Sequence, residues 1–488
     1  MADQDQVNDD LEGLDVNMFD TDSDEEISNV HSQMANVQLQ TPQRDQKPIS
    51  SNITYPPRST PLQDQQKQSE AFRQIMSQDG NSAFLLRAFY NRFFPYKTYF
   101  QWLNYDIAPT KNFSHREFSF TLKSDIYVRY NSFMDVEEFR KEIERFQPVK
   151  IDIGAVYSVM PKNKKSVAEK AFRPVEKELV FDIDMTDYDE IRTCCSGGDI
   201  CKKCWQFMTV AIKVIDTSLD EDFGFKHRLW VYSGRRGVHC WVCDDRARKL
   251  DNESRKAIVN FLEVIKGGSE QSRKVNLGNS LHPSLARSLE IIKPYFGPLI
   301  LNSQGVLDTP ENWNKVLNTI PDAGVRERLN EMWSTDSLSS GQAKWQDLIN
   351  VLDKSSDKQI FYKKEGWKIS TIFQYCYPRL DDKVSINIGH LLKSPFCVHP
   401  KTQRVCVPIP ITTCENFDPF SVPTLSSLIN EFDAFSANNG PDDSERKLPD
   451  YKKTSLRPYI EFFEKFVQRL LLDAQRAKRE EASVSMEF

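Results

Sequence analysis

Residues 178–189 read ELVFDIDMTDYD, and within them Asp182 and Asp184 alternate with large apolar residues. In a β-strand, side chains two positions apart lie on the same face, so one face would be buried and the other would carry both carboxylates. Two carboxylates that close repel each other unless they face water or share a cation. Taken alone, the pair favours a solvated strand edge over a metal site. Asp187 and Asp189 are interpreted as turn residues beyond the strand.

Strand and helix patterns are interleaved on both sides of this segment. Alternating apolar residues predict strands in REFSFTL, DIYVRY and KIDIGAVYS, and three- and four-residue spacings predict a helix in VEEFRKEIERF. Between residues 253 and 355 helical patterns recur without strand patterns, and strand and turn character returns near residue 368. We therefore predict an α+β fold: a mixed α/β core over residues 69–252 and 356–488, and a helical subdomain over 253–355.

The first 68 residues are rich in Asp, Gln, Ser, Asn and Pro, which predicts a disordered acidic and polar tail; Leu11–Phe19 could form a short docking motif within it. The first 26 residues hold 11 Asp and Glu and no Lys or Arg, so the formal charge of −6 for all 488 residues becomes about +5 for the rest. A mildly basic body is compatible with a nucleic-acid partner. No apolar run approaches the roughly 18 residues of a membrane span, and no secretory leader is recognised. We expect a soluble intracellular protein whose cysteines are thiols or metal ligands.

Four cysteines lie close together in TCCSGGDICKKC, residues 193–204. Cys194, Cys195, Cys201 and Cys204 could supply the four thiolates of a tetrahedral Zn²⁺ site, and the Gly-Gly turn lets the loop fold back on itself. A closed four-cysteine site is structural and not catalytic. The adjacent pair Cys194 and Cys195 departs from ordinary ligand spacing, so one of the two could be a spectator.

Two further segments carry candidate anion ligands. In VYSGRRGVHCWV, residues 231–242, glycines would allow close backbone approach to a phosphate, and Ser233, Arg235, Arg236 and His239 would donate to it. The alternative is an exposed basic hairpin tip. PRLDDKVSINIGHLLKSPFCVHPKTQR, residues 378–404, offers one more carboxylate and several cations. These are Asp381 or its neighbour Asp382, with Lys393, His399, Lys401 and Arg404.

Together, FDIDM, the four-cysteine loop, SGRRGVHCWV, PRLD and HLLKSPFCVHPKT resemble the small, catalytic subunit of the archaeo-eukaryotic DNA primases, in the eukaryotic order and spacing. The resemblance runs from about Ser69 to residues 450–456 and beyond. It implies a mixed α/β primase core with a helical subdomain and a small zinc motif. The implied activity is synthesis of short RNA primers de novo on single-stranded DNA, from ribonucleoside triphosphates and by two-metal nucleotidyl transfer.

The resemblance also implies roles for individual residues. Asp182, Asp184 and Asp381 would bind catalytic Mg²⁺ or Mn²⁺, and Glu117 would stand with them in the catalytic group. Asp152 would lie near the ribose, and Arg379 close to the catalytic acid. The residues expected around the incoming nucleotide are Tyr127, Arg129, Asp152, Ser233, Arg235, Arg236, His239, Arg379, Lys393 and His399.

The same resemblance implies partners and a location. The partners would be a large primase subunit that carries an iron–sulfur cluster and the DNA polymerase alpha complex, in the nucleus and not at a membrane. Two alternatives stay open: a primase-polymerase that extends DNA, and a non-catalytic zinc-containing subunit that binds nucleic acid. A metal-dependent nuclease would also use paired acids, but it has no need of a triphosphate pocket.

Overall fold

The computed structural model describes residues 82–486 except 267–273, 276, 278–279, 321, 354–357 and 439–447. The tail predicted over residues 1–68, with its candidate docking motif, lies outside the described residues. By its internal contacts the chain divides into Met1–Phe84 and Leu85–Phe488, and the elements that bear on the candidate site belong to the second unit. The predicted boundaries between a core and a helical subdomain stay predictions.

The strands of the described residues form two main antiparallel sheets and one short ribbon. The larger sheet has the order β10-β3-β1-β2, with β4 paired to β3, and the second sheet has the order β5-β7-β6. The strands are β1 (Arg116–Thr121), β2 (Tyr127–Asn131), β3 (Lys150–Tyr157), β4 (Pro174–Glu176), β5 (Leu179–Asp184), β6 (Arg228–Tyr232), β7 (Gly237–Val242), β8 (Ile265–Lys266), β9 (Lys274–Val275) and β10 (Leu392–Lys393). The predicted strands in REFSFTL, DIYVRY, KIDIGAVYS and ELVFDIDM are therefore confirmed, and so is the mixed fold class.

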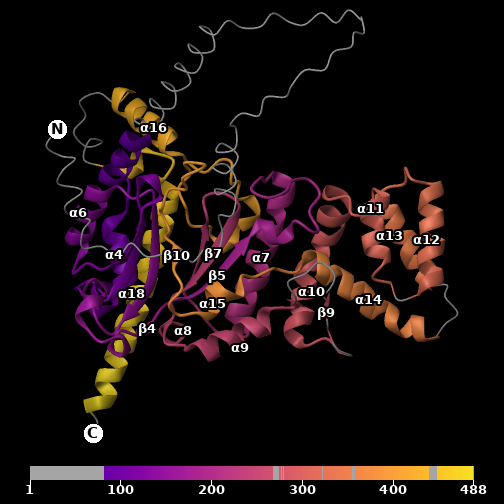
Figure 1. Cartoon of the computed structure of the whole chain (residues 1–488), viewed down its shortest axis with the longest axis horizontal. Coiled ribbons are helices and arrows are strands. Elements are labelled where there is room, and N and C mark those ends of the chain that lie inside the picture. The colour runs from indigo at the N-terminus through magenta and orange to yellow at the C-terminus, as the bar shows by residue number, and fades with distance from the viewer. Residues whose placement is uncertain are drawn as a thin grey trace, which may run out of the picture. The chain divides into compact units, whose positions relative to one another are not determined.

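Helices cover both sheets and continue into a mainly helical region (Figure 1). A first helix spans residues 82–92. The others are α4 (Tyr96–Asn104), α5 (Lys111–Ser114), α6 (Val136–Phe146), α7 (Lys202–Glu221), α8 (Asp245–Arg248), α9 (Asn252–Leu262), α10 (Pro283–Tyr295), α11 (Pro310–Leu317), α12 (Ala323–Thr335), α13 (Gly341–Asp353), α14 (Lys358–Cys376), α15 (Asp382–Ile386), α16 (Leu425–Asn438) and α18 (Arg457–Met486). Short 3₁₀ turns are η1 (Lys123–Asp125), η2 (Pro161–Ser166), η3 (Glu169–Ala171), η4 (Met185–Tyr188), η6 (Ile411–Asn416) and η7 (Asp450–Lys453), and η5 (Phe296–Ser303) is a π-helix.

Aromatic side chains connect the two sheets through one core. Tyr99 of α4 stacks on Phe139 of α6 with ring centroids 5.5 Å apart, and Phe139 packs on Phe118 of β1 at 5.2 Å. From the same helix α4, Trp102 contacts Trp241 of β7 at 5.4 Å. Aromatic pairs of this kind contribute packing energy beyond the area that they bury. Helix α4 thus fixes the larger sheet against the sheet that carries the paired aspartates.

The chain from α9 to Cys376 is mainly helical. Helices α11, α12 and α13 are neighbours, and α14 packs on α10, α13 and η5 (Figure 1). The return to strand and turn character expected near residue 368 is wrong, because α14 continues to Cys376. Ile372, Phe373 and Tyr375 are buried in that last part of α14. Their aromatic and β-branched side chains favour a strand prediction. That preference largely reflects burial, and these side chains can be buried equally well in a packed helix.

A long helix, α18, spans Arg457–Met486. It packs along α4 (Figure 1). Phe463 of α18 contacts both Trp102, at 5.7 Å, and Phe396, at 5.1 Å, so the helix supports the loop that follows β10. Among the described residues, no helix is both long and apolar enough to cross a membrane.

Candidate active site and a four-cysteine cluster

The paired aspartates stand on the open face of β5. Phe181 and Ile183 are fully buried, whereas 27% of the Asp182 side chain and 33% of the Asp184 side chain are exposed. The alternation predicted from the sequence is therefore confirmed. In the register of β5 with β7, Asp182 lies opposite His239, whose Nε2 is 3.5 Å from the Asp182 carboxylate.

The third carboxylate reaches this pair through the backbone. The amide of Asp381 donates to the carbonyl oxygen of Asp182 at 3.2 Å, so the segment before α15 runs beside β5. Asp381 is the N-cap of α15, and its side chain accepts from the amide of Lys383 at 3.1 Å. Asp382, by contrast, is exposed. Of the two candidate acids, Asp381 is the one that adjoins Asp182.

The electrostatics of the three acids differ sharply. Burial, followed by the charges of Asp184 and Asp381, raises the pKa of Asp182 to about 8. Burial would also raise the pKa of Asp184, but hydrogen bonds from Arg236 and from the amide of Thr186 outweigh it and lower that pKa. Arg236 Nε lies 2.8 Å from each oxygen of the Asp184 carboxylate. Of the two carboxylates on β5, the ionised form of Asp182 is the less stable, so a bound cation would stabilise it more than Asp184.

The glycine-rich turn between β6 and β7 brings the predicted anion ligands next to these acids. Ser233 Oγ accepts from the amide of Gly237 at 3.0 Å, which closes the turn. Gly234 has φ +91°, and a Cβ there would stand 2.6 Å from the Cβ of His399. Both its conformation and its contact therefore require glycine. The tight turn places Arg235 and Arg236 at its tip.

Lys393 and His399 complete the cationic side of the site. Lys393 pairs with Asp152 in the register of β10 with β3, and its Nζ reaches towards the carbonyl of Ser233 at 3.5 Å. It therefore joins the larger sheet to the glycine-rich turn. Burial, with the charges of Lys393 and Arg235 after it, lowers the pKa of His399 to about 3, so this imidazole is neutral at neutral pH. Its Nδ1 accepts from the amide of Lys401 at 3.2 Å.

The remaining predicted residues of the larger sheet form two pairs. Glu117 of β1 is buried and holds Arg129 of β2 by bonds of 2.9 and 3.3 Å. Ser119 links Tyr127 and Asp152, because its Oγ is 3.1 Å from the Tyr127 hydroxyl and 3.1 Å from the Asp152 carboxylate. Asp152 is in turn paired with Lys393 across the sheet. The structure thus connects these residues to the site through β10.

Arg379 is placed differently from the other predicted nucleotide ligands. Its guanidinium is buried, donates to the carbonyl of Asp187 at 2.6 Å and lies 3.4 Å from Glu190. Its amide donates to the Tyr188 hydroxyl at 3.1 Å. These contacts hold η4, which directly follows Asp184 in the chain, and the predicted role at the nucleotide stays a prediction.

A buried ion network supports the start of β5. Glu178 accepts from both terminal nitrogens of Arg116, at 2.8 and 3.0 Å, and from the Tyr105 hydroxyl at 2.5 Å. Burial would raise the pKa of Glu178, but Arg116 outweighs it and lowers the pKa to about 2. Lys177 is also fully buried and donates to the carbonyl of His390, which ties β5 to the loop before β10.

The four predicted zinc ligands converge. The sulfur atoms of Cys194, Cys195, Cys201 and Cys204 all lie within 4.8 Å of one another. In the described part of the chain, this is the one group of three or more His, Cys, Asp or Glu side chains gathered so closely. Burial would raise the pKa of Cys201, but the amide of Cys204 and the Cys194 thiol lower it to about 7. Four clustered thiols with one near ionisation fit a tetrahedral metal such as Zn²⁺.

The three aspartates are gathered less closely than the four cysteines. The aspartates are adjacent but not as tightly gathered, since Asp184 turns to Arg236 and Asp381 caps α15. Three partly exposed carboxylates in one place are the oxygen donors that Mg²⁺ and Mn²⁺ prefer, so the donor set fits a divalent cation.

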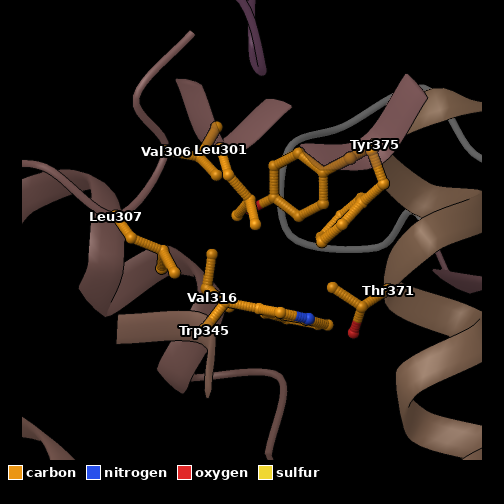
Figure 2. A pocket seen from close by; sticks show the side chains of 8 residues that line it. Leu301, Val306, Leu307, Val316, Trp345, Thr371 and Tyr375 are labelled. Atoms are coloured by element: carbon orange, nitrogen blue, oxygen red, sulfur yellow. The ribbon is translucent and has the colours of Figure 1, made fainter. Parts of the chain in front are cut away.

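A small hollow within the helical region has no such chemistry (Figure 2). Its lining is apolar apart from the polar atoms of Thr371, Tyr375 and Trp345, and it includes no carboxylate, histidine or lysine. None of the site residues predicted from the sequence lines it. Figure 2 shows the rings of Trp345 and Tyr375 on opposite sides of the hollow, as expected of imperfect core packing.

Comparison with known proteins decides the family. The family model for the DNA primase small subunit matches residues 181–411. The DNA primase small subunit of Schizosaccharomyces pombe is 42% identical over 410 residues, which are 80% of this chain and 90% of that protein. The chain belongs to the DNA primase small-subunit family. The family protein of Drosophila melanogaster is 41% identical over 83% of this chain and 93% of its own length, and that of Thermococcus onnurineus is 28% identical over 60% and 78%.

Among solved structures, a polymerase domain from Mycobacterium tuberculosis ligase D in complex with DNA aligns with 69% of this chain and 87% of its own. The TM-score is 0.31 and the identity 10%, a likeness too low to bear on the fold. The segment matched by the primase small-subunit family begins at Phe181 and ends at Ile411. It contains the three aspartates, the four cysteines and both basic segments, whereas the predicted residues of β1, β2 and β3 precede it.

Sequence reasoning missed three residues that organise the cysteine loop of this primase small-subunit family member. Arg192 is buried and donates to the carbonyls of Gly197 and Asp199, at 2.7 and 2.8 Å. Asp189, interpreted as a turn residue, accepts from Arg192 and from the amide of Gly197. Gln304 of the helical region donates to the Cys194 sulfur at 3.5 Å. Nothing in the local sequence distinguishes these residues from surface polar residues.

Proposed function

We propose that this chain is a primase catalytic subunit that synthesises short RNA primers de novo on a single-stranded DNA template, by two-metal transfer of nucleotides from ribonucleoside triphosphates. The observation that carries the proposal is the backbone bond from Asp381 to Asp182, because it adds a third carboxylate beside the pair on β5. Membership of the primase small-subunit family supports the same activity.

Asp182, Asp184 and Asp381 are the residues that would hold the divalent cations. When bound, Mg²⁺ or Mn²⁺ supplies Lewis-acid stabilisation of the charge on the reacting phosphate and helps a 3′-hydroxyl to ionise. The protein's own contribution begins with Asp182, whose pKa is raised by burial and then by the charges of Asp184 and Asp381. Arg236 holds the Asp184 carboxylate, which limits the repulsion among the three acids.

The cationic residues would bind and orient the triphosphate. Arg235 and Arg236 present guanidinium groups at the tip of the turn, and Lys393 adds an ammonium group from β10. Since Nδ1 of His399 accepts from Lys401, its neutral imidazole carries its proton on Nε2 and can donate that hydrogen to a phosphate oxygen. Donors fixed in this way need no reorganisation as charge develops on the phosphates.

The residues of the larger sheet would contact the rest of the nucleotide. Asp152 is held by Ser119 and stands across from Lys393, so its carboxylate can accept from a ribose hydroxyl when the triphosphate occupies the cationic side. Glu117 of β1, which is buried, and Arg129 of β2, which is partly exposed, form an ion pair in the same sheet. A 2′-hydroxyl bonded to Asp152 would favour ribonucleotides over deoxyribonucleotides, in line with primer synthesis and against a primase-polymerase that extends DNA.

We further propose the partners that the family suggests. The relatives are named as small subunits, which supports a larger partner subunit in this case too. That subunit would carry an iron–sulfur cluster, act with the DNA polymerase alpha complex and work in the nucleus. Zn²⁺ in the four-cysteine cluster would have a structural role.

Incubation with single-stranded DNA, ribonucleotides and Mn²⁺ tests the activity. We expect short RNA products from the wild-type chain and from Asp473→Asn, which changes a half-exposed carboxylate on α18. Asp182→Asn should abolish them, because it removes a candidate metal ligand without changing the size of the side chain. Products made only from deoxyribonucleotides would instead indicate a primase-polymerase. No product from either nucleotide, together with nucleic-acid binding that Asp182→Asn leaves unchanged, would indicate a non-catalytic binding subunit.

A further inference from the structure

Arg235, at the tip of the glycine-rich turn, lies against Gly198 of the four-cysteine loop. A Cβ at residue 198 would stand 2.6 Å from the Arg235 Cζ, nearer still to Nη2, and 3.2 Å from Nη1. The guanidinium therefore rests directly on the Gly198 backbone. Contacts below 3.0 Å essentially never occur for a real Cβ, so any side chain at this position would displace Arg235.

The backbone of Gly198 does not itself require glycine. Gly197 has φ +53°, in the left-handed region that favours glycine, but Gly198 is not among the glycines with positive φ. A substitution at Gly198 thus leaves the turn conformation accessible, and the group that excludes a side chain there is the Arg235 guanidinium. The two neighbouring glycines therefore have different roles. Gly197 adopts the positive φ of the turn, and Gly198 leaves space for the Arg235 guanidinium.

The loop that presents Gly198 is held rigidly from several sides. Asp189 accepts from the amide of Gly197 at 2.9 Å, and Arg192 bonds the carbonyls on both sides of Gly198. The four clustered cysteines bracket the same turn, two before it and two after it. Since Asp189 follows directly after η4, the loop is also tied to the segment that leaves Asp184. The backbone at Gly198 is therefore held in a fixed position.

Arg235 and Arg236 are held by different means. Arg236 is bonded to the Asp184 carboxylate, whereas no ion pair or side-chain hydrogen bond orients the Arg235 guanidinium within the part of the chain that the structure describes. Arg235 is half-buried, and its own carbonyl accepts from the Tyr232 hydroxyl at 3.0 Å. What fixes the direction of its guanidinium is packing on Gly198. Its hydrogen-bond donors thereby remain available to an anion.

We propose that the four-cysteine loop positions Arg235 for the triphosphate of the incoming nucleotide, with Gly198 as the positioning residue. This inference rests on the proposed function, because it assigns a role to a contact beside the nucleotide site. It gives the cysteine cluster a role beyond stabilising the fold. Metal in the cluster would hold the loop in place, the loop positions Gly198, and contact with Gly198 orients the Arg235 guanidinium. Of these groups, only Arg235 would contact the nucleotide, beside the other nucleotide ligands proposed above.

Gly198→Ala tests the contact, with Gly366→Ala as the matched control. Gly366 lies in α14 and a Cβ there would meet nothing within 4 Å, so the control adds the same methyl group without a contact. Equilibrium binding of ATP in the presence of Mn²⁺ is measured for both variants, for Arg235→Ala and for the double variant Gly198→Ala/Arg235→Ala. We expect Gly198→Ala to weaken ATP binding about tenfold, the loss of one charge-assisted hydrogen bond, and Gly366→Ala to leave it unchanged.

The double variant separates positioning from general damage. If Gly198 acts through Arg235, Gly198→Ala adds no further loss once Arg235 is already alanine, and zinc content and Tm of Gly198→Ala match the wild type. Equal losses in both backgrounds, or a loss of zinc from Gly198→Ala, would overturn the proposal. If the wild type binds ATP and Gly198→Ala binds it equally well, the positioning role fails and the proposed function stands. If the wild type binds no ATP, the proposed function fails and the positioning role fails with it.

Discussion

Arg236 Nε lies 2.8 Å from both carboxylate oxygens of Asp184. Asp184 is predicted to bind a cation and Arg236 to bind a triphosphate. In the ion pair, Arg236 takes the place of the cation at Asp184, and Asp184 takes the place of a phosphate at Arg236. This relationship explains why the pKa of Asp184 is lowered, whereas burial and the charges of Asp184 and Asp381 raise that of Asp182. It also predicts competition between Arg236 and the cation for Asp184.

Arg236→Gln should therefore have opposite effects on the two ligands. Without nucleotide, we expect Mn²⁺ to bind a few-fold more tightly, since a partly exposed ion pair of about 1 kcal/mol no longer competes for Asp184. ATP should bind about tenfold more weakly, because a guanidinium is lost from the phosphate side. Titration of Mn²⁺ by electron paramagnetic resonance and of ATP by calorimetry measures both. Weaker binding of Mn²⁺ to the variant would contradict the competition.

Asp381→Asn, compared with Asp382→Asn, tests which of the two adjacent acids serves the site. Asparagine caps a helix as well as aspartate, so Asp381→Asn preserves the start of α15 and removes only the charge beside Asp182. We expect primer synthesis to fall at least about 100-fold, since even outer partners of a metal site cost 10–100-fold when removed. The exposed Asp382 should tolerate the same change within about twofold. Equal losses from both substitutions would show that the pair acts only through local charge.

The cysteine cluster predicts about one equivalent of zinc per chain, measured by plasma mass spectrometry of the purified protein. Serine at any one of Cys194, Cys195, Cys201 or Cys204 should reduce it below half an equivalent, because all four sulfur atoms converge. Cys414→Ser is the matched control, a buried cysteine outside the cluster, and should retain the metal. If Cys195→Ser or Cys194→Ser retains full zinc, that residue is the spectator left open by the sequence.

The buried Lys177 predicts a pH dependence of stability. Burial, and next the charge of Arg255, lowers its pKa from 10.5 to about 7 in the folded chain. Between those values the unfolded chain binds a proton that the folded chain does not, so this group's contribution to stability rises with pH across that window and is constant outside it. The rise cannot exceed about 1.4 kcal/mol per pH unit.

Thermal unfolding of Lys177→Met at pH 7, 8 and 9 measures this contribution. We expect the variant to gain Tm relative to the wild type at pH 7 and to lose that advantage steadily towards pH 9, because only the wild type carries the penalty at lower pH. Lys226→Met is the control, since 67% of the Lys226 side chain is exposed. A constant difference in Tm between Lys177→Met and the wild type would show that Lys177 remains charged in the folded chain.

Much of the local structure followed from side-chain patterns. The period of two in ELVFDIDM placed Asp182 and Asp184 on the open face of β5, and the burial of Phe181 and Ile183 confirms it. Four cysteines within so short a loop have little freedom to separate, so their convergence was also predictable. The end of α14 was mispredicted, because aromatic residues such as Tyr375 suit a strand or a buried helix equally well and the choice depends on neighbours far along the chain.

The amino-acid sequence by itself determined which residues carry chemistry here, because carboxylates, thiols and guanidinium groups each bind a characteristic class of ligand. Their spacing along one strand or loop also limits the directions in which they point. Only the tertiary structure decided how they are combined. It set Asp381 rather than Asp382 beside Asp182, turned Arg379 towards η4, and seated Arg235 on Gly198. Each of these contacts joins segments separated by long stretches of chain, and such contacts follow from tertiary packing and not from any local pattern.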